Sequence, residues 1–323
     1  MLKEYRYDGS EEINLKKVPT SPKDMKHRKE ELVAKTAANQ LQIQQLQDKL
    51  YADGREGLII LIQARDAAGK DGTIKHVMSG VNPQGVDVYS FKSPTHQDLA
   101  HDFLWRFNKA LPERGKIAIF NRSYYEDVLI VKVRELWKTY KLPDRLLDSS
   151  IITRRYKQIS QFEEYLYDNG YRIVKIYLNV SAKTQKKRFL ERIERPEKNW
   201  KFSEADLSER GLWKQYTEAY EDMINATSTE HNPWYVIPAD KKWFARYLVS
   251  EAILNALEKI DPQYPTLSKD QIDKLHIYKE ALEGEKPSTE EDSFEATAVE
   301  VEAAGGTVTK DKDDQAALDI QNH

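Results

Sequence analysis

The sequence predicts an α/β protein in which helices cover both faces of a five-stranded parallel sheet. Short apolar segments rich in β-branched residues alternate along the chain with longer helical segments, an order typical of such sheets. The first apolar segment, Leu58 to Ile62, leads within a few residues to Gly69-Lys70 and then Gly72-Thr73. Strand, loop, lysine and helix in this order indicate a P-loop, because the free N–H groups at a helix N-terminus form an anion site.

Each element follows from a local pattern. Segments rich in apolar and β-branched residues predict strands at about 58–62, 86–91, 116–120, 171–180 and 234–237. Segments rich in helix formers and closed by turn residues predict helices at about 24–51, 70–78, 95–111, 145–168, 211–227 and 241–259. Ser181 is expected to cap a further, strongly basic helix.

Composition divides the chain of 323 residues into four parts. We expect an N-terminal arm and long helix at 1–56 and a core at 57–260 that includes a lid at about 181–210. A C-terminal helical extension at 261–286 and an acidic, disordered tail at 287–323 follow. The tail holds ten acidic and two basic side chains, a balance of −8. Because the net charge of the whole chain is −3, the rest of the chain carries +5, which suits a polyanionic partner.

Several protein classes are excluded by what the sequence lacks. Without cysteine there is neither a disulfide framework nor a thiolate metal site. No apolar run approaches the length of a membrane helix, and the first residues lack the apolar region of a signal peptide. A cytoplasmic protein without nucleic-acid or membrane partners is therefore expected.

The phosphate loop departs from the usual G-x-x-x-x-G-K-[ST] pattern. Ala64 stands at the first glycine position, Asp71 follows the lysine, and Thr73 is the nearest hydroxyl. Asp66 lies inside the loop, where its charge would repel phosphates unless Mg²⁺ or a transferring group lies between them. An acid at this position indicates phosphoryl chemistry, the alternative being that Asp66 merely caps the helix.

A polar segment follows the third predicted strand. Because ligands bind at the carboxyl ends of parallel strands, Asn121, Arg122, Glu126 and Asp127 are expected near the phosphate loop, where an acid would help to hold Mg²⁺. The alternative interpretation is a surface turn of mixed charge.

The helix after the fourth strand is basic on one face. Arg188 and Arg192 are four residues apart, and Lys198 and Lys201 follow a break at Pro196. Guanidinium groups bind phosphate oxygens two at a time, so this run predicts a lid over a chain of phosphates, although such a run can also be a solvated face.

Taken together, these motifs resemble the polyphosphate kinase 2 family over most of residues 25–260. The matching residues are Asp66 to Thr73, Asn121 to Asp127, and Arg188-x-x-x-Arg192-x-x-x-Pro196-x-Lys198-x-Trp200-Lys201. Arg65 departs from the pattern, in which Met precedes the loop Asp; it either adds charge near the phosphates or faces the helix layer.

The resemblance implies a three-layer α/β/α P-loop kinase fold with a helical lid, and an enzyme that uses Mg²⁺ to move the terminal phosphate of inorganic polyphosphate onto a nucleotide. Family members that act on both mono- and diphosphates are similar to this chain at Asn121 to Asp127, whereas members that prefer diphosphates tend to carry Asp at the position of Asn121. We therefore expect reversible conversion of AMP to ADP and of ADP to ATP, GMP and GDP as further acceptors, and a homodimer or homotetramer.

The chemistry is assigned to residues by charge, since phosphoryl transfer needs positioning and neutralisation more than covalent catalysis. Catalytic roles are predicted for Asp66, Lys70, Asn121, Arg122 and Glu126, with Asp66 and Glu126 as metal ligands. Phosphate and polyphosphate binding is predicted for Ala67, Ala68, Gly69, Lys70, Asp71, Gly72, Thr73, Arg122, Arg188, Arg192, Lys198 and Lys201. Nucleotide binding is predicted for Asp66, Asn121, Tyr125, Glu126 and Asp127.

Two other functions remain open from the sequence. An ATP-dependent nucleoside monophosphate kinase would share the fold and the lid, but the altered loop and Asp66 argue against ATP as the usual donor. A non-catalytic polyanion-binding module would use the same basic face and would need neither Asp66 nor Glu126.

Overall fold

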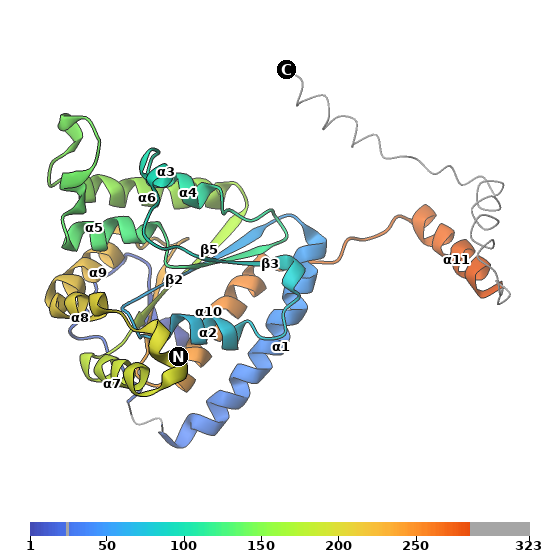
Figure 1. The fold of residues 1–323 in the computed structure, drawn as a ribbon. Coiled ribbons are helices and arrows are strands. Elements are labelled where there is room, and N and C mark those ends of the chain that lie inside the picture. Colours follow the sequence, from blue (N-terminus) through green and yellow to red (C-terminus); the bar gives the residue numbers. More distant parts are fainter. Residues whose placement is uncertain (24–25, 285–323) are drawn as a thin grey trace. The chain divides into compact units, whose positions relative to one another are not determined.

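The structure, a computed structural model, describes residues 1–23 and 26–284 and separates the chain into two units, Met1–Pro265 and Thr266–His323. The first unit contains a six-stranded sheet in the order β1-β6-β5-β2-β4-β3. Figure 1 shows this sheet, in which β2, β3 and β5 are labelled, with helices on both sides. The strands are β1 (Arg6–Tyr7), β2 (Gly57–Ala64), β3 (Val86–Ser90), β4 (Ile117–Asn121), β5 (Tyr171–Asn179) and β6 (Trp234–Pro238). Strands β2 to β6 are parallel, which places their carboxyl ends along one edge of the sheet.

The prediction of a five-stranded, wholly parallel sheet is wrong in one respect. A sixth strand, β1, pairs antiparallel with β6, with Arg6 opposite Tyr235 and Tyr7 opposite Trp234. A strand of two residues is too short to show a period of two, so only its pairing with β6 reveals it.

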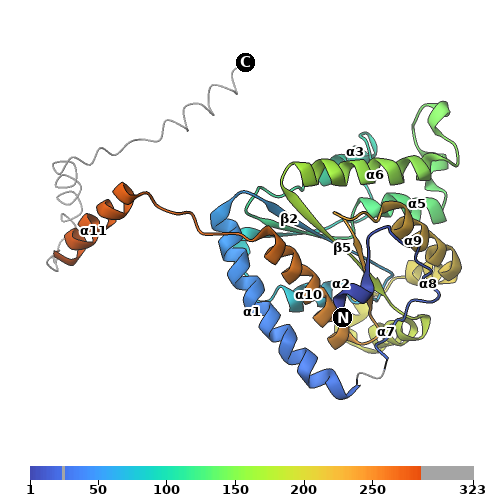
Figure 2. The same ribbon diagram turned by 180° about the vertical axis from the view of Figure 1, so that it is seen from behind.

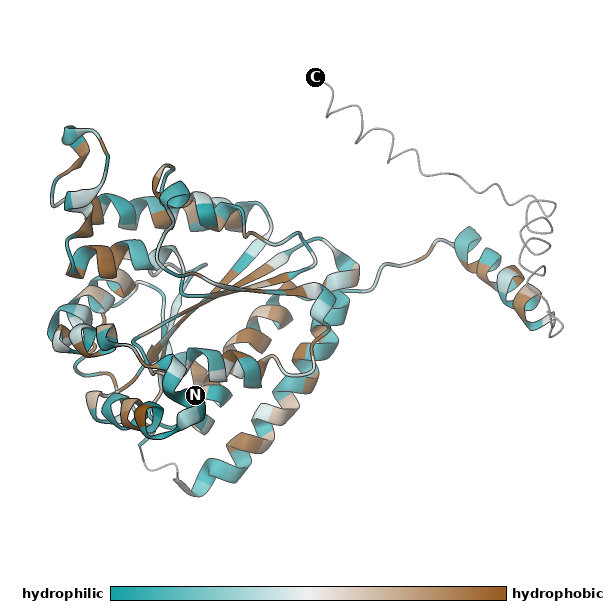
Figure 3. Cartoon of the chain, viewed as in Figure 1, coloured by the Kyte–Doolittle hydropathy of each residue, from teal (hydrophilic) through white to brown (hydrophobic). Residues whose placement is uncertain are grey.

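The sheet lies between two layers of helices. One layer holds α1 (Lys29–Asp53), α2 (Lys70–Val77) and α10 (Lys242–Ile260), seen together in Figure 2. The other layer contains α4 (Trp105–Asn108), α5 (Ile130–Val133), α6 (Ile151–Asp168) and α9 (Trp213–Thr227). An apolar cluster fills the space between the sheet and each helix layer, and alternate residues of β2 belong to one cluster or the other. This strand is therefore buried on both faces. It is apolar throughout its centre, as Figure 3 shows for the middle of the sheet.

Local capping divides some of the predicted helices. The segment 95–111 contains α3 (His96–Leu99), opened by a capping box of Thr95 and Asp98, and then the separate α4. After β5 come α7 (Ala182–Glu194), the 3₁₀ helix η7 (Pro196–Lys201) and α8 (Glu204–Gly211), with a second capping box at Ser203 and Asp206. The other 3₁₀ helices are η1 (Leu2–Tyr5), η2 (Lys26–Arg28), η3 (Pro83–Gly85), η4 (Tyr124–Val128), η5 (Leu136–Thr139) and η6 (Asp144–Leu146).

The N-terminal residues, expected as a polar arm, pack on the sheet and on α9. Ile13 and Leu15 are buried, at 4% and 6% exposure. The Asn225 side chain accepts a hydrogen bond from the Ile13 N–H (2.8 Å) and donates to the Ile13 carbonyl (3.1 Å). Two isolated apolar residues in a polar segment carry no periodic signal, so the sequence does not show this docking.

The second unit contains α11 (Lys269–Gly284), none of whose residues is buried. The predicted acidic tail at 287–323 and the predicted helix start at residue 24 lie outside the described residues. Over residues 1–23 and 26–284, no helix is both long and apolar enough to cross a membrane.

Candidate active site

The phosphate loop joins the central strand β2 to α2. Ala67 and Gly69 both have positive φ, 59° and 106°, which tightens the loop around the start of the helix. The Lys70 ammonium folds back over it and donates a hydrogen bond to the Ala64 carbonyl (3.0 Å). Burial lowers the pKa of Lys70, which is 9% exposed.

Arg65 does not add its charge to the loop. Its guanidinium lies 3.9 Å from the centre of the Trp213 ring and donates to the Thr217 hydroxyl (2.6 Å). Of the two possibilities that the sequence left open, the structure therefore shows contact with the helix layer, here α9.

The end of β4 lies beside the loop because β4 pairs with β2, with Asn121 opposite Ile62. Arg122 donates to Asp66 Oδ1 at 2.9 Å, and Asn121 Nδ2 donates to Asp71 Oδ1 at 2.9 Å. Asn121 Oδ1 is buried and has no hydrogen-bond partner. Two motifs separated by about fifty residues thus form one cluster of charged and polar groups.

The basic helix α7 and the following η7 contribute cations to the same place. Arg188 donates to the carbonyls of Ala67 (3.1 Å) and Ala68 (2.6 Å), so it holds the phosphate loop itself. Arg192 lies 3.4 Å from an Asp206 carboxylate oxygen, and Lys201 lies 3.4 Å from an Asp71 oxygen. Two lid cations are therefore paired with carboxylates that a phosphate chain could replace.

These groups line one cleft of about 930 Å³. Nine Lys and Arg side chains and four Asp and Glu side chains surround it, an excess of positive charge that suits a polyanion. The predicted site residues that line it are Asp66, Ala67, Ala68, Gly69, Lys70, Asp71, Gly72, Thr73, Asn121, Arg122, Arg188, Arg192, Lys198 and Lys201.

Three predicted nucleotide-binding residues are not among the lining residues. Glu126 lies close by and is half-buried. The Gln63 amide, oriented so that its oxygen and its nitrogen both have partners, donates to Glu126 Oε1 (2.9 Å). Burial raises the pKa of Glu126, although Arg122 and Lys70 act in the opposite direction. The Tyr125 hydroxyl donates to Glu163 (2.7 Å), and the Asp127 carboxylate accepts from the buried Arg155 (3.4 Å), so both side chains face the protein interior.

Sequence reasoning missed several residues of the cleft. Lys92 follows β3, and Lys242 and Arg246 come from α10. Burial and the nearby Arg188 lower the pKa of Lys242. Lys242 and Arg246 are four residues apart, a spacing that indicates a shared helix face. The neighbouring sequence does not show that this face lies opposite the lid. Trp200, 77% exposed, was part of the quoted motif without a role.

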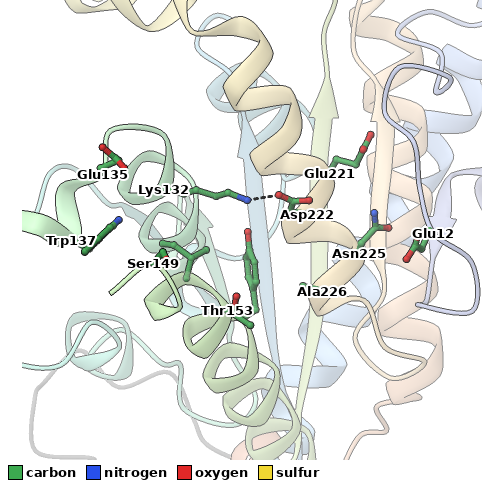
Figure 4. A pocket seen from close by; sticks show the side chains of 12 residues that line it. Glu12, Lys132, Glu135, Trp137, Ser149, Thr153, Glu221, Asp222, Asn225 and Ala226 are labelled. Atoms are coloured by element: carbon green, nitrogen blue, oxygen red, sulfur yellow. Dashed lines mark hydrogen bonds and ion pairs between the residues drawn. The ribbon is translucent and has the colours of Figure 1, made fainter. Parts of the chain in front are cut away.

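A second cavity, of about 730 Å³, is less suited to phosphate (Figure 4). Four acidic residues line it, Glu12, Glu135, Glu221 and Asp222, and its lysine, Lys132, is paired with Asp222. Because this charge repels phosphate, the cleft beside Lys70 is the candidate active site.

The donor set in the cleft fits a hard divalent cation. Within residues 1–23 and 26–284, no cluster of three or more His, Asp and Glu could hold a metal by itself. Mg²⁺, however, is usually bound by one or two carboxylates together with substrate phosphates and water. Asp66 and Asp71 supply carboxylate oxygens, and the unpartnered Asn121 Oδ1 supplies a neutral one.

The fold and the site define the class of the protein. A parallel sheet, a phosphate loop after its central strand, an acid in that loop and an opposing rack of cations are the parts of a P-loop kinase. This confirms the predicted fold class, with the sheet corrected to six strands.

Comparison with known proteins identifies the family. The family model described as Polyphosphate kinase 2 (PPK2) matches residues 26–265, and the chain belongs to this family. It is 46% identical over 265 residues to an ADP-polyphosphate phosphotransferase of Rhodopseudomonas palustris, covering 81% of this chain and 92% of that protein. It is 42% identical over 265 residues to an AMP/ADP-polyphosphate phosphotransferase of Meiothermus ruber, covering 82% and 96%.

A solved structure agrees with this assignment. The crystal structure of polyphosphate kinase 2 from Arthrobacter aurescens superposes with a TM-score of 0.77 at 37% identity, covering 85% of this chain and 96% of that chain. The resemblance predicted from the three motifs is thereby confirmed.

Proposed function

We propose that this enzyme moves the terminal phosphate of inorganic polyphosphate onto AMP and ADP, giving ADP and ATP, and that the reaction is reversible. The observation that carries the proposal is the cleft, in which Lys70 of the phosphate loop, the Asp66–Arg122 pair and the lid cations surround one space. The names of the two relatives support polyphosphate as donor and ADP as acceptor, and one of them adds AMP.

The transfer needs little covalent help from the protein. An oxygen of the acceptor phosphate forms a bond to the terminal phosphorus of polyphosphate, and the bond from that phosphorus to the bridging oxygen breaks. The bridging oxygen stays on the shortened polyphosphate with its electron pair. Since a phosphate monoester is largely a dianion at pH 7, the attacking oxygen needs no general base. The protein's task is to align two anions and to offset their repulsion.

Lys70, Arg122 and the loop N–H groups perform this task. Lys70 and the amides at the start of α2 hold the phosphates of the donor, and Arg122 neutralises charge that develops on the transferring group. The Arg122 guanidinium already lies 2.9 Å from Asp66, so it is oriented toward the loop before substrate binds. Such preorganisation avoids reorientation during the reaction.

A divalent cation, Mg²⁺, completes the site in this proposal. Asp66 would hold it together with substrate phosphates, and Asp71 is the other carboxylate of this part of the cleft. Glu126, which does not line the cleft, stays a predicted contact to a metal or to the acceptor. The ion would neutralise phosphate charge when bound. Asp66 would then carry out two functions, since it also orients Arg122.

The lid residues bind the polyphosphate chain. Arg192 and Lys201 exchange Asp206 and Asp71 for phosphate oxygens, Lys198 adds a further contact, and Lys242 and Arg246 extend the positive surface onto α10. Arg188 keeps the loop in shape through its carbonyl contacts. GMP and GDP as further acceptors, a homodimer or homotetramer and a cytoplasmic location belong to the proposal as predictions.

One experiment tests the donor and the acceptor range together. The purified protein is mixed with Mg²⁺ and AMP, either polyphosphate or ATP is added as donor, and ADP and ATP are followed by chromatography. We expect ADP and then ATP from AMP and polyphosphate alone. Product with ATP as the sole effective donor would instead indicate a nucleoside monophosphate kinase. Tight polyphosphate binding without any turnover would indicate a non-catalytic module.

A further inference from the structure

Two adjacent tyrosines, separated from Arg122 by Ser123 alone, share one buried carboxylate. Tyr124 and Tyr125, at the start of η4, donate hydrogen bonds to the same oxygen, Glu163 Oε1, at 2.8 Å and 2.7 Å. Glu163 lies on α6 and is 1% exposed. Its other oxygen accepts from the Lys175 ammonium at 2.7 Å, and Lys175, on β5, also donates to the Thr227 carbonyl at 2.6 Å. The network therefore ties η4 to α6, β5 and the end of α9.

Stability alone does not account for an ion pair at this depth. Lys175 is 0% exposed, and removing two charges from water costs several kcal/mol per ion. Apolar residues of similar volume are often as stable or more stable in such places. What the pair supplies, and apolar residues would not, is a fixed and oriented acceptor for two hydroxyl groups.

The neighbouring backbone needs such an anchor. Arg122 has φ of +64°, a left-handed conformation that costs a side-chain-bearing residue roughly 1–3 kcal/mol and persists only when surrounding contacts enforce it. On its N-terminal side the Arg122 N–H donates to the Ile62 carbonyl at 3.1 Å. On its C-terminal side, the two tyrosines bound to Glu163 hold the chain. The segment is thus fixed on both sides of Arg122.

We propose that Glu163 is a positioning residue for phosphoryl transfer: through Tyr124 and Tyr125 it holds Arg122 in the backbone conformation that directs its guanidinium toward Asp66 and the cleft. This inference rests on the proposed function. Glu163 does not itself line the cleft, so its effect reaches the reacting groups through η4. The exact placement of a guanidinium at the reacting phosphate affects turnover more than binding, so the effect belongs in kcat.

The test compares two double variants that both remove the buried charges. E163Q/K175M keeps a carbonyl oxygen as acceptor for the tyrosines, whereas E163L/K175M removes it. We expect E163L/K175M to lower kcat by about 10- to 100-fold with both KM values within about threefold, and E163Q/K175M to stay within about 1.5-fold of the native kcat. Equal kcat values for the two double variants would overturn the inference.

Single variants keep the test decisive if E163L/K175M fails to fold. Tyr124→Phe removes one of the two hydroxyls and leaves the Glu163–Lys175 pair intact; we expect kcat to fall by about threefold at an unchanged melting temperature within about 3 °C. Ser250→Ala is the matched control, because this buried hydroxyl donates to the Tyr247 carbonyl in the opposite helix layer. Equal kcat for the two single variants would contradict a positioning role. Absence of polyphosphate-dependent turnover in the native enzyme would instead refute the proposed function.

Discussion

Lys70 differs from the other cations of the cleft in being buried. Its ammonium contacts the Ala64 carbonyl. Lys70 is the one buried side chain among the described Lys and Arg residues that line the cleft. A charge with so little water around it interacts strongly with a bound phosphate, because the local dielectric is low. The proposed site therefore depends on this residue more than on the exposed cations.

We expect Lys70→Ala to lower kcat with polyphosphate and AMP by at least about 100-fold, because the variant loses the charge that stabilises the transferring phosphate. Steady-state kinetics measure the effect. Lys75→Ala is the control, since Lys75 is exposed on the same helix and does not line the cleft. Turnover within about tenfold of the native value would contradict the assignment of the phosphate loop.

Asp127 makes stability depend on pH. Burial raises the pKa of Asp127 to about 6 from 3.8, and the facing Arg155 only partly offsets this. The folded state thus favours the neutral carboxyl. The neutral Asp127 carboxyl contributes to the free energy of unfolding, and this contribution is fully present below pH 3.8, where Asp127 is protonated in both states. It is lost as the pH rises through about 6, because the folded state then has to ionise a buried group.

Asp127→Asn removes this dependence. We expect the difference in free energy of unfolding between variant and native protein to shift in favour of the variant by about 2 kcal/mol between pH 4 and pH 8. Denaturant unfolding at the two pH values measures the shift. A difference that does not change with pH would show that the pKa of Asp127 is the same in the folded and unfolded states.

At the scale of elements, the lid consists of α7, η7 and α8, and two of its cations are already paired with carboxylates. Arg192 lies 3.4 Å from Asp206 of α8, while Lys201 of η7 lies 3.4 Å from Asp71 at the start of α2. Part-exposed pairs of this kind contribute little to stability, so phosphate can replace them at low cost. The elements are thus placed to close on polyphosphate by exchange of partners.

We expect Arg192→Ala or Lys201→Ala to raise the apparent KM for polyphosphate by about tenfold and to leave the KM for AMP within about twofold. Initial rates at varied concentrations of each substrate separate the two effects. Arg195→Ala serves as control, because Arg195 is exposed, pairs with Glu197 and does not line the cleft. Equal damage to both KM values would argue against a lid specific for polyphosphate.

At the scale of the whole molecule, the residues of the proposed chemistry belong to the unit Met1–Pro265. The cleft, both helix layers and the match to the family lie within it. The described part of the second unit is α11, which buries none of its residues. Nothing in the proposed mechanism requires that helix.

A chain ending at Pro265 is therefore expected to keep kcat within about twofold and its melting temperature within about 3 °C. A chain ending at Lys241 is the matched control: it also loses α10, which buries Leu248, Ala252 and Leu257 against the sheet, and we expect no cooperative unfolding transition. Loss of activity in the chain that ends at Pro265 would show that residues beyond 265 take part in catalysis or assembly.

The sequence by itself determined the features that depend on contiguous residues. The apolar strand before Gly69-Lys70, the polar segment at Asn121 to Asp127 and the basic face of α7 were readable from composition and period, and together they indicated the family. Helix and strand formation at these places follows from local propensity and burial, which short segments encode.

Only the tertiary structure decided which groups meet. It brought β1 to the edge of the sheet, placed Lys242 and Arg246 of α10 on the cleft, and turned Arg188 onto the loop carbonyls. It also turned Tyr125 away from the cleft, toward Glu163. The physical reason is that a side chain's partner is set by packing between elements far apart in the chain, whereas sequence patterns report only what neighbouring residues share.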